Sequence, residues 1–191
     1  MSKIIAATGN KGKLKEIKEI FPEYEIISSK EAGFNVEVEE DANTFEGNAL
    51  KKAVAIAKVS GELCLADDTG IMIDYYKGWP SVHTDRWMKG TDREKNLAII
   101  EKMQGLPKED RVVHWVTAIA IADGNGKNYV STHSVDGTIA TSIRGENGFG
   151  FDEIFELENG KTLAELSDKE KNEIGARKKA LNKVKQYLPK N

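Results

Sequence analysis

The first residues of the chain have types and a spacing that suit phosphate binding. A short apolar run ends at Thr8, and Thr8-Gly9-Asn10-Lys11-Gly12-Lys13 leads at once into a lysine-rich helix. The unpaired N–H groups of a helix N-terminus attract anions, small residues let a phosphate approach, and Lys11 and Lys13 add full charges. The stretch matches neither a Walker loop nor a G-x-G-x-x-G turn, so an ordinary strand–turn–helix is the alternative.

Two acidic segments are candidates for holding a hard cation. Glu37-Val38-Glu39-Glu40-Asp41 precedes an expected helix, and Asp67-Asp68-Thr69-Gly70 lies between two short apolar runs. Mg²⁺ prefers oxygen ligands and commonly joins one or two carboxylates to substrate phosphates. Because successive side chains of an extended chain alternate in direction, we expect one aspartate to serve the metal or a water and the other to hold its neighbours. The alternatives are a solvated charge run and a simple Asx turn.

Two later segments could contact a nucleobase or could be purely structural. Gly145–Asp152 places aromatic residues among glycines, so Phe149 or Phe151 could stack on a base and Asp152 could accept a hydrogen bond from its edge. A loop with core aromatics explains the same pattern. Residues 170–179 carry charges on most faces, which by itself is typical of a solvated surface helix.

Apolar periodicity and turn residues predict strands that alternate with helices, followed by a long hairpin. Val- and Ile-rich runs mark the strands, helical spacing marks the helices, and Asp123-Gly124-Asn125-Gly126 is typical of a hairpin turn. This order predicts an α/β fold with a mixed sheet rather than a doubly wound one. The expected strands are 4–8, 25–28, 63–66, 71–73, 111–122 and 128–141, and the expected helices are 13–21, 45–59, 92–103 and 163–188.

Composition limits the classes of protein to which the chain can belong. Its 191 residues, 39% hydrophobic and 31% charged, suffice for one core, so a single domain over residues 1–191 is expected. The net charge of −3 is weak and mixed, which argues against binding to nucleic acid. No apolar run approaches the roughly 18 residues of a membrane span, and the lone Cys64 excludes a disulfide framework. We expect a cytoplasmic protein with no membrane partner.

Taken together, five segments resemble the inosine triphosphate pyrophosphatase family, whose members hydrolyse non-standard purine nucleoside triphosphates. The match extends over nearly the whole chain in the family's order, and five segments in order are far more specific than any one alone. The segments are Thr8–Lys13, Glu40 with Thr44–Ala49 and Lys52-Ala53, Ala66–Gly70, Gly148–Phe155, and Thr162–Leu166 with Glu170–Asn172.

The resemblance implies an elongated mixed-sheet α/β fold, two lobes around a central cleft, and usually a homodimer. It also implies Mg²⁺-dependent hydrolysis of dITP, ITP or XTP to the monophosphate and pyrophosphate, which sanitises the nucleotide pool. Glu40 and Asp68 would hold the metal, and Asp68 would orient or deprotonate the attacking water. Lys13 and Lys52 would complete the catalytic set. The implied substrate residues are Thr8, Gly9, Asn10, Lys11, Gly12 and Lys13 at the triphosphate, Thr69 beside it, and Phe149, Gly150, Phe151, Asp152, Lys171, Ala176 and Arg177 at the base.

The chain departs from the family's pattern mainly near the expected base pocket. Family members usually carry Ser-His-Arg where this chain has Gly175-Ala176-Arg177, so the histidine is missing. Loss of one hydrogen-bonding group should weaken the preference for a 6-keto purine, or raise KM, without changing the phosphate chemistry. Two alternatives therefore stay open: a pyrophosphatase with a shifted base preference, and a nucleotide-binding regulatory protein without turnover. Trp79, Trp87 and Met88 could serve a dimer interface or pack in a core.

Overall fold

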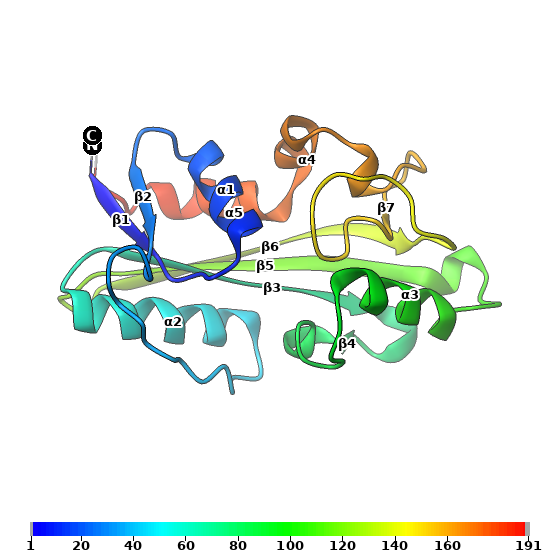
Figure 1. Cartoon of the computed structure of the whole chain (residues 1–191), viewed down its shortest axis with the longest axis horizontal. Coiled ribbons are helices and arrows are strands. Elements are labelled where there is room, and N and C mark those ends of the chain that lie inside the picture. The colour runs from blue at the N-terminus through cyan, green and yellow to red at the C-terminus, as the bar shows by residue number, and fades with distance from the viewer. Residues whose placement is uncertain (1, 190–191) are drawn as a thin grey trace. The chain divides into compact units, whose positions relative to one another are not determined.

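A seven-stranded mixed sheet organises the chain, whose computed structural model describes residues 2–189 (Figure 1). Its order is β2-β1-β3-β5-β6-β7, with β4 paired to β3. β1 is parallel to β2 and to β3, whereas β4 on β3 and β7 on β6 are antiparallel. The expected mixed α/β fold is thereby confirmed. The strands are β1 (Lys3–Ala6), β2 (Glu25–Ser28), β3 (Cys64–Ile73), β4 (Trp79–Pro80), β5 (Val112–Ala122), β6 (Asn128–Ile139) and β7 (Phe155–Glu156); the helices are α1 (Lys11–Ile20), α2 (Phe45–Ser60), α3 (Asp92–Lys102), α4 (Asp168–Ile174) and α5 (Ala176–Lys185).

Contacts divide the chain into two compact units. Unit 1 contains the described residues up to Thr69, residues Thr117–His133, and those from Ala176 onward. Unit 2 contains Gly70–Val116 and Ser134–Gly175. Because the divisions at 69, 116 and 133 fall inside β3, β5 and β6, these three strands contribute residues to both units.

Unit 1 is built from helices on both faces of its strands. Figure 1 shows α1 and α5 on one face and α2 on the other. Local signals set the helix ends: Asn10 caps α1 by accepting from the Lys13 N–H, and Thr44 caps α2 by accepting from the Gly47 N–H. Gly61 ends α2 in the left-handed conformation, with φ of 71°, which glycine adopts without steric cost.

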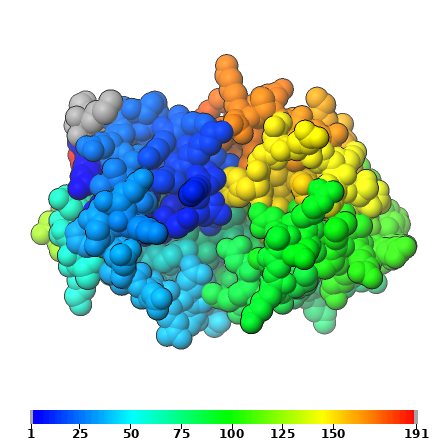
Figure 2. All heavy atoms as spheres, viewed as in Figure 1, coloured from blue at the N-terminus to red at the C-terminus, as the bar shows by residue number. Residues whose placement is uncertain are grey.

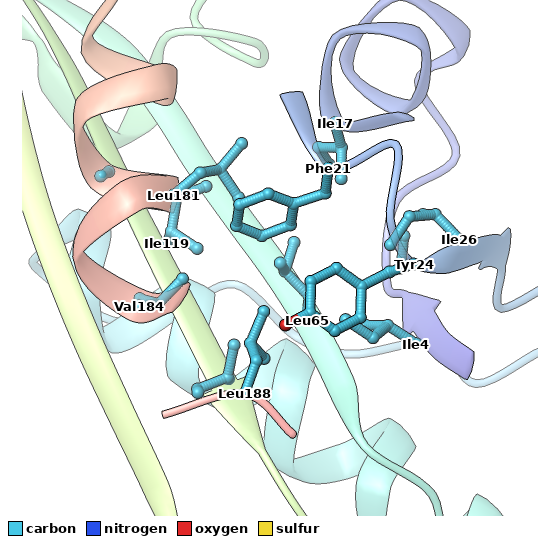
Figure 3. Packing of buried hydrophobic residues seen from close by; sticks show 13 residues of the cluster. Ile4, Ile17, Phe21, Tyr24, Ile26, Leu65, Ile119, Leu181, Val184 and Leu188 are labelled. Carbon is cyan, nitrogen blue, oxygen red and sulfur yellow. The ribbon is translucent and has the colours of Figure 1, made fainter. Parts of the chain in front are cut away.

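The core of unit 1 joins α1 and α5 to the sheet. Phe21 and Tyr24, which follow α1, turn their rings towards Leu65 of β3 and Leu181 and Val184 of α5 (Figure 3). Phe21 and Leu181 are fully buried, and removal of such side chains from water is worth about 1.5–3 kcal/mol each. This packing anchors α1 and α5 on one side of β3, and with them the loop that follows β1.

Unit 2 has a separate core around the ends of the long strands. Ile71 and Ile73 of β3 pack with Ile99 of α3 and with Phe151 and Phe155. Two helices here begin with reciprocal capping boxes, Thr91 with Glu94 at α3 and Ser167 with Glu170 at α4. Trp79 and Trp87 meet edge to face with ring centroids 4.8 Å apart and pack against this core.

Two expected elements differ from the structure. Asp67-Asp68-Thr69-Gly70 is not a turn between two strands but the middle of the single ten-residue strand β3. The expected helix 163–188 is interrupted twice. Leu163–Glu165 is a 3-10 turn followed by extended Leu166 and Ser167, and Gly175, with ψ of 143°, separates α4 from α5. In both cases long-range contacts of charged side chains outweigh the local turn or helix signal, as described below.

Within the described part of the chain, no helix is both long enough and apolar enough to cross a membrane.

A histidine in unit 2 leads to the first testable prediction. Nδ1 of His114 lies 2.7 Å from Oδ1 of Asp136, and Nε2 lies 3.0 Å from Oδ1 of Asp74. The hydrogen bond to Asp136 raises the pKa of His114, partial burial opposes the rise, and Asp74 adds to it. A raised folded-state pKa adds stability that is complete below about pH 6.5 and is lost as the pH rises through the folded-state value.

We therefore expect the melting temperature of the unmodified protein to fall between about pH 6 and about pH 9, and that of His114→Gln to fall less. Thermal unfolding of both proteins across this range measures the difference. If the melting temperatures of the two proteins change equally with pH, Asp74 and Asp136 do not stabilise protonated His114.

Candidate functional site

The loop after β1 brings three predicted residues to the carboxyl end of the strand. Thr8 Oγ1 accepts from the Asn10 N–H at 3.2 Å, and Asn10 Oδ1 accepts from the Lys13 N–H at 3.1 Å. These bonds hold the loop over the first turn of α1. Nζ of Lys13 then reaches Oδ2 of Asp67 at 3.1 Å. The N-terminus of α1, the Lys13 ammonium group and β3 therefore meet in one place, and a helix N-terminus attracts anions.

Asp67 and Asp68 lie beyond the point where β1 ends, since the last β1 residue, Ala6, pairs with Leu65. Adjacent residues of a strand point to opposite faces. Asp67 contacts Lys13 of α1 and Arg177 of α5, whereas Asp68 contacts Asn48 and Lys52 of α2. The two aspartates therefore contact different sets of neighbours, and the assignment of one of them to a metal or a water stays a prediction.

The Asp67 side is a buried network of charges. Arg177 Nη2 donates to Asp67 Oδ2 at 3.0 Å and to Thr69 Oγ1 at 3.2 Å, and Arg177 Nη1 pairs with Glu16. Thr69 Oγ1 also lies 3.0 Å from Asp67 Oδ2. Asp67 is 1% exposed and Arg177 is 5% exposed. Because buried charges are tolerated only when paired, this network explains why Arg177 is buried although the charges of residues 170–179 favour a solvated helix.

The Asp68 side joins α2 to the acidic segment before it. Asn48 Nδ2 donates to Asp68 Oδ2 at 3.1 Å. Lys52 Nζ lies 2.6 Å from Glu40 Oε1 and 3.5 Å from Asp68 Oδ1. Figure 2 shows the segment between β2 and α2, in light blue, at the surface. The side chain of Glu40 is accordingly 32% exposed, whereas that of Asp68 is 12% exposed. The two carboxyl groups thus converge from the surface and from the sheet.

For each of the two aspartates, burial raises the pKa and the neighbouring cations lower it. Burial alone would raise the pKa of Asp67, but Lys13, Arg177 and Lys52 outweigh it and hold this pKa far below its usual value. Burial raises the pKa of Asp68, and Lys52 and the Asn48 hydrogen bond offset the rise only in part. The pKa of Lys52 is raised, because Asp67, Asp68 and Glu40 outweigh the burial that would lower it. The cations around Asp67 therefore favour its charged form, whereas the charge of Asp68 is compensated only in part.

The chemistry of the donor set on the Asp68 side fits Mg²⁺. Glu40 and Asp68 offer hard carboxylate oxygens, and both already contact the same ammonium group of Lys52, so their oxygens face a common point. Across residues 2–189, no cluster of three or more His, Cys, Asp or Glu side chains is arranged to hold a metal. Mg²⁺ usually takes one or two protein carboxylates and fills its remaining positions with water and substrate phosphate, so a two-carboxylate site is compatible with it.

The glycine-rich loop and Lys171 meet in unit 2. Asp152 is fully buried, and its Oδ2 accepts from Lys171 Nζ at 2.6 Å and from the Phe149 N–H at 2.8 Å. The Lys171 ammonium lies 4.4 Å from the centre of the Phe149 ring and 5.6 Å from that of Trp115. Phe151 packs in the core of unit 2. Phe151 is thus a core aromatic, as one of the two interpretations of this loop expects. Phe149 is only partly buried, and its ring faces the Lys171 ammonium group.

The structure brings some predicted residues together and separates others. Unit 1 contains the predicted residues of the triphosphate and metal sites together with two residues predicted at the base: Thr8, Gly9, Asn10, Lys11, Gly12, Lys13, Glu40, Lys52, Asp68, Thr69, Ala176 and Arg177. Unit 2 contains the other residues predicted at the base: Phe149, Gly150, Phe151, Asp152 and Lys171. Two expectations change in detail. The Asp152 carboxylate accepts a hydrogen bond from the Phe149 N–H and so supports the loop from inside. The Arg177 guanidinium contacts Asp67, Thr69 and Glu16. Both groups neutralise buried partners.

Sequence reasoning assigned no role to three side chains that the structure places at these sites. Asn48 is completely buried on α2, Glu16 pairs with Arg177, and Trp115 lies beside Lys171. A signal existed for Asn48, since it falls on the apolar face of α2 with Phe45 and Ala49, where a polar side chain needs a partner. Glu16 lies three residues after Lys13 and so shares its helix face. Nothing local marked Trp115.

Two glycines of the loop provide a matched pair for a second prediction. Gly148 has φ of 82°, and a Cβ there would lie 1.9 Å from Asp152 Oδ2. Gly150 has φ of 63°, but a Cβ there would meet nothing within 4 Å. Gly150→Ala should cost only the strain of the left-handed conformation, about 1–2 kcal/mol of unfolding free energy.

Gly148→Ala should cost at least about 1 kcal/mol more, because Asp152 must also give up a hydrogen-bonded position next to Lys171. Urea unfolding of both variants measures the two losses. Equal losses would mean that the Asp152 carboxylate can move without penalty.

The chain is similar in sequence to known proteins over nearly its whole length. The chain matches the family model described as the Ham1 family over residues 4–187. It is 40% identical to a dITP/XTP pyrophosphatase of Desulforamulus reducens over 191 residues, which cover 97% of this chain and 95% of that protein. It is also 40% identical to a dITP/XTP pyrophosphatase of Bacillus subtilis over 194 residues, 98% of each.

Solved structures agree with the sequence relatives. The Ham1 protein of Staphylococcus aureus superposes with a TM-score of 0.86 at 33% identity, and 98% of each chain is covered. A HAM1 protein of Coxiella burnetii superposes with a TM-score of 0.87 at 33% identity and the same coverage.

Proposed function

Since the chain belongs to the Ham1 family, we propose that it is a nucleoside triphosphate pyrophosphatase. Its substrates would be the non-standard purine nucleotides dITP, ITP and XTP, and its products the monophosphate and pyrophosphate. One observation carries the proposal. The Thr8–Lys13 loop, the ammonium groups of Lys13 and Lys52, and the carboxylates of Asp67 and Asp68 meet around β3, just past the end of β1.

The triphosphate would bind at the loop formed by Thr8, Asn10 and Lys13. The N-terminus of α1 supplies N–H groups and partial positive charge, and Lys13 supplies a full charge that Asp67 holds in place. Gly9, Lys11 and Gly12 complete the loop. Lys52, between Glu40 and Asp68, would add a second cation next to the phosphates.

Glu40 and Asp68 would hold Mg²⁺. When bound, the ion neutralises phosphate charge and lowers the pKa of a coordinated water. The protein's own part is positional: Asp68 would orient the water in line with the α-phosphorus and take its proton. Lys13 and Lys52 would stabilise the negative charge that develops as pyrophosphate leaves.

The base would meet the Phe149–Gly150 loop and Lys171. Phe149 offers a ring face, and Asp152 fixes the Lys171 ammonium beside it. Phe151 and Asp152 would support this loop from the core. Thr69 and Arg177 would act through Asp67 rather than at the base edge.

Ala176 is the observation that favours a second candidate, the same reaction with a shifted base preference. It is the first residue of α5, is buried, and carries only a methyl group where the related family has a histidine. A site that lacks one hydrogen-bonding group discriminates less against bases with a different edge.

Release of pyrophosphate from dITP, XTP, dGTP, dATP and dUTP, with and without Mg²⁺, tests the proposal. Mg²⁺-dependent turnover with strong preference for dITP or XTP is expected. Even turnover of all purines would favour the shifted preference. Binding without any turnover would favour a regulatory nucleotide-binding protein and overturn the proposal.

We also infer a homodimer that acts on the cytoplasmic nucleotide pool without nucleic acid or membrane partners. The family resemblance supports the dimer, and Trp79 and Trp87 remain partly exposed beside the unit 2 core. Sedimentation of the unmodified protein at micromolar concentration tests this state, and a monomer there would remove the inference.

A further inference from the structure

We propose that Asn48 is a positioning residue that holds Asp68 and the segment of Glu40 in fixed relation, so that both carboxylates face one divalent cation. This inference rests on the proposed function for the roles of Glu40 and Asp68. It adds a residue that touches neither substrate nor metal but determines whether the two carboxylates are arranged to bind the ion.

The contacts of the Asn48 amide carry the proposal. Its Nδ2 donates to Asp68 Oδ2 at 3.1 Å, and its Oδ1 accepts from the Ala42 N–H at 3.0 Å. Asn48 has no exposed surface, so neither bond competes with water. One rigid amide therefore ties a strand carboxylate to the backbone two residues after Glu40.

Lys52 shows that the two tied groups converge. It lies one helical turn after Asn48 on α2 and contacts both Glu40 and Asp68 through its ammonium group. Residues 48 and 52 thus share a helix face, and both bridge the same two parts of the chain. Asn48 does so without charge, so its two bonds do not compete with a cation.

The first turn of α2 is shaped for this contact. A Cβ on Gly47 would lie 2.7 Å from the Ala42 Cβ, so the segment before α2 can approach this closely only because residue 47 is glycine. Ala42 is then near enough for its N–H to reach Asn48. Glycine at 47 and asparagine at 48 therefore serve one function, which is to dock the Glu40 segment on α2.

Few side chains can replace Asn48 here. The site needs a donor towards a carboxylate and an acceptor towards an N–H, and an amide supplies both on a short, planar group. Aspartate would place a second negative charge against Asp68, and alanine would leave both partners unsatisfied. Groups that hold metal-binding carboxylates by hydrogen bonds typically contribute about 10–100-fold to metal affinity or activity.

The test is Mn²⁺ binding by the nucleotide-free protein, measured by the loss of the free-ion electron paramagnetic resonance signal. Mn²⁺ suits carboxylate and water ligands as Mg²⁺ does. We expect Asn48→Ala to bind Mn²⁺ at least about tenfold more weakly than the unmodified protein. Ile56→Ala removes a buried apolar side chain two helical turns after Asn48. It should bind Mn²⁺ within about twofold of the unmodified protein and controls for loss of helix stability.

Gly47→Ala is the second variant, in case Asn48→Ala does not fold. Alanine favours the helix at this position, but its methyl group must displace Ala42 and with it the Glu40 segment. We expect the same direction of change, weaker Mn²⁺ binding and a higher Mg²⁺ concentration for half-maximal activity.

Unchanged Mn²⁺ affinity in either folded variant would overturn the proposal, and so would absence of Mn²⁺ binding by the unmodified protein. These outcomes are separate from failure of the proposed function, which is judged by pyrophosphate release from the unmodified protein. A protein whose Mn²⁺ affinity falls in Asn48→Ala but which releases no pyrophosphate would support the positioning role and refute the proposed enzyme activity.

Discussion

Asp68→Asn should lower pyrophosphate release about 10²–10⁴-fold, which is the range that a positioned proton acceptor contributes. The substitution keeps the shape of the side chain and an oxygen that can still accept from Asn48 Nδ2. It removes the negative charge that Lys52 and a metal would share. Because the Thr8–Lys13 loop is unchanged, nucleotide should still bind within a few-fold of the original affinity. Turnover and nucleotide binding are measured on the same preparation.

Asp41→Asn is the matched control. Asp41 follows Glu40 in the same acidic segment, but it is exposed and pairs with Lys51 rather than Lys52. Its loss should change turnover by less than about twofold, since exposed ion pairs are worth little. If Asp68→Asn retains more than about a tenth of the original turnover, Asp68 is not the residue that activates water.

Arg177→Met should lower the free energy of unfolding by about 3–5 kcal/mol, the cost of leaving buried charges without their partner. Arg177 neutralises both Asp67 and Glu16, and methionine would fill its volume without its charge. Lys13 would remain as the ion-pair partner of Asp67. Urea unfolding at neutral pH measures the loss directly.

Lys185→Met provides the comparison, because it breaks the exposed ion pair between Lys185 and Glu23. That change should cost no more than about 1 kcal/mol. The pKa of Asp67 is lowered in the folded state, so its stabilisation is present above the ordinary aspartate value of about 3.9 and is lost as the pH falls below it. The difference in unfolding free energy between Arg177→Met and the unmodified protein should therefore become smaller as the pH falls below about 3.9. Similar losses for both variants at neutral pH would mean that the buried network adds little.

The contrast between these two predictions comes from the two faces of β3. On one face Asp67 is surrounded by Lys13 and Arg177, so its charge is used within the protein. On the other face Asp68 has Lys52 and one amide bond, and burial raises its pKa. A substitution at Arg177 should accordingly affect stability first, whereas one at Asp68 should affect turnover first.

Local chemistry made several elements predictable. The expected strand 25–28 is β2 itself, and the expected helix 45–59 differs from α2 by one residue, because Thr44 and Gly61 cap it. The hairpin of β5 and β6 lies at the predicted Asp123–Gly126 turn. These features depend on neighbours within a few residues, which a sequence displays directly.

Other features were out of reach of local reasoning. The Asp-Asp-Thr-Gly stretch has residue types typical of a turn, yet it is extended within β3, where a lysine contacts the carboxylate on each face. Arg177 reaches Asp67 across 110 positions in the chain. Lys171 and Asp152 are buried as a pair, although each looks like a surface residue in isolation.

The sequence by itself determined which chemical groups this protein has available: a lysine-bearing loop after the first strand, paired carboxylates, and a loop of aromatics among glycines. It also determined the caps and turns that begin and end the elements. Only the tertiary structure decided which carboxylate is neutralised and which faces a cation, and that Asn48 joins Asp68 to the Glu40 segment. The physical reason is that the energy of a buried charge depends on the partners brought to it from distant parts of the chain, and the residue type alone does not specify those partners.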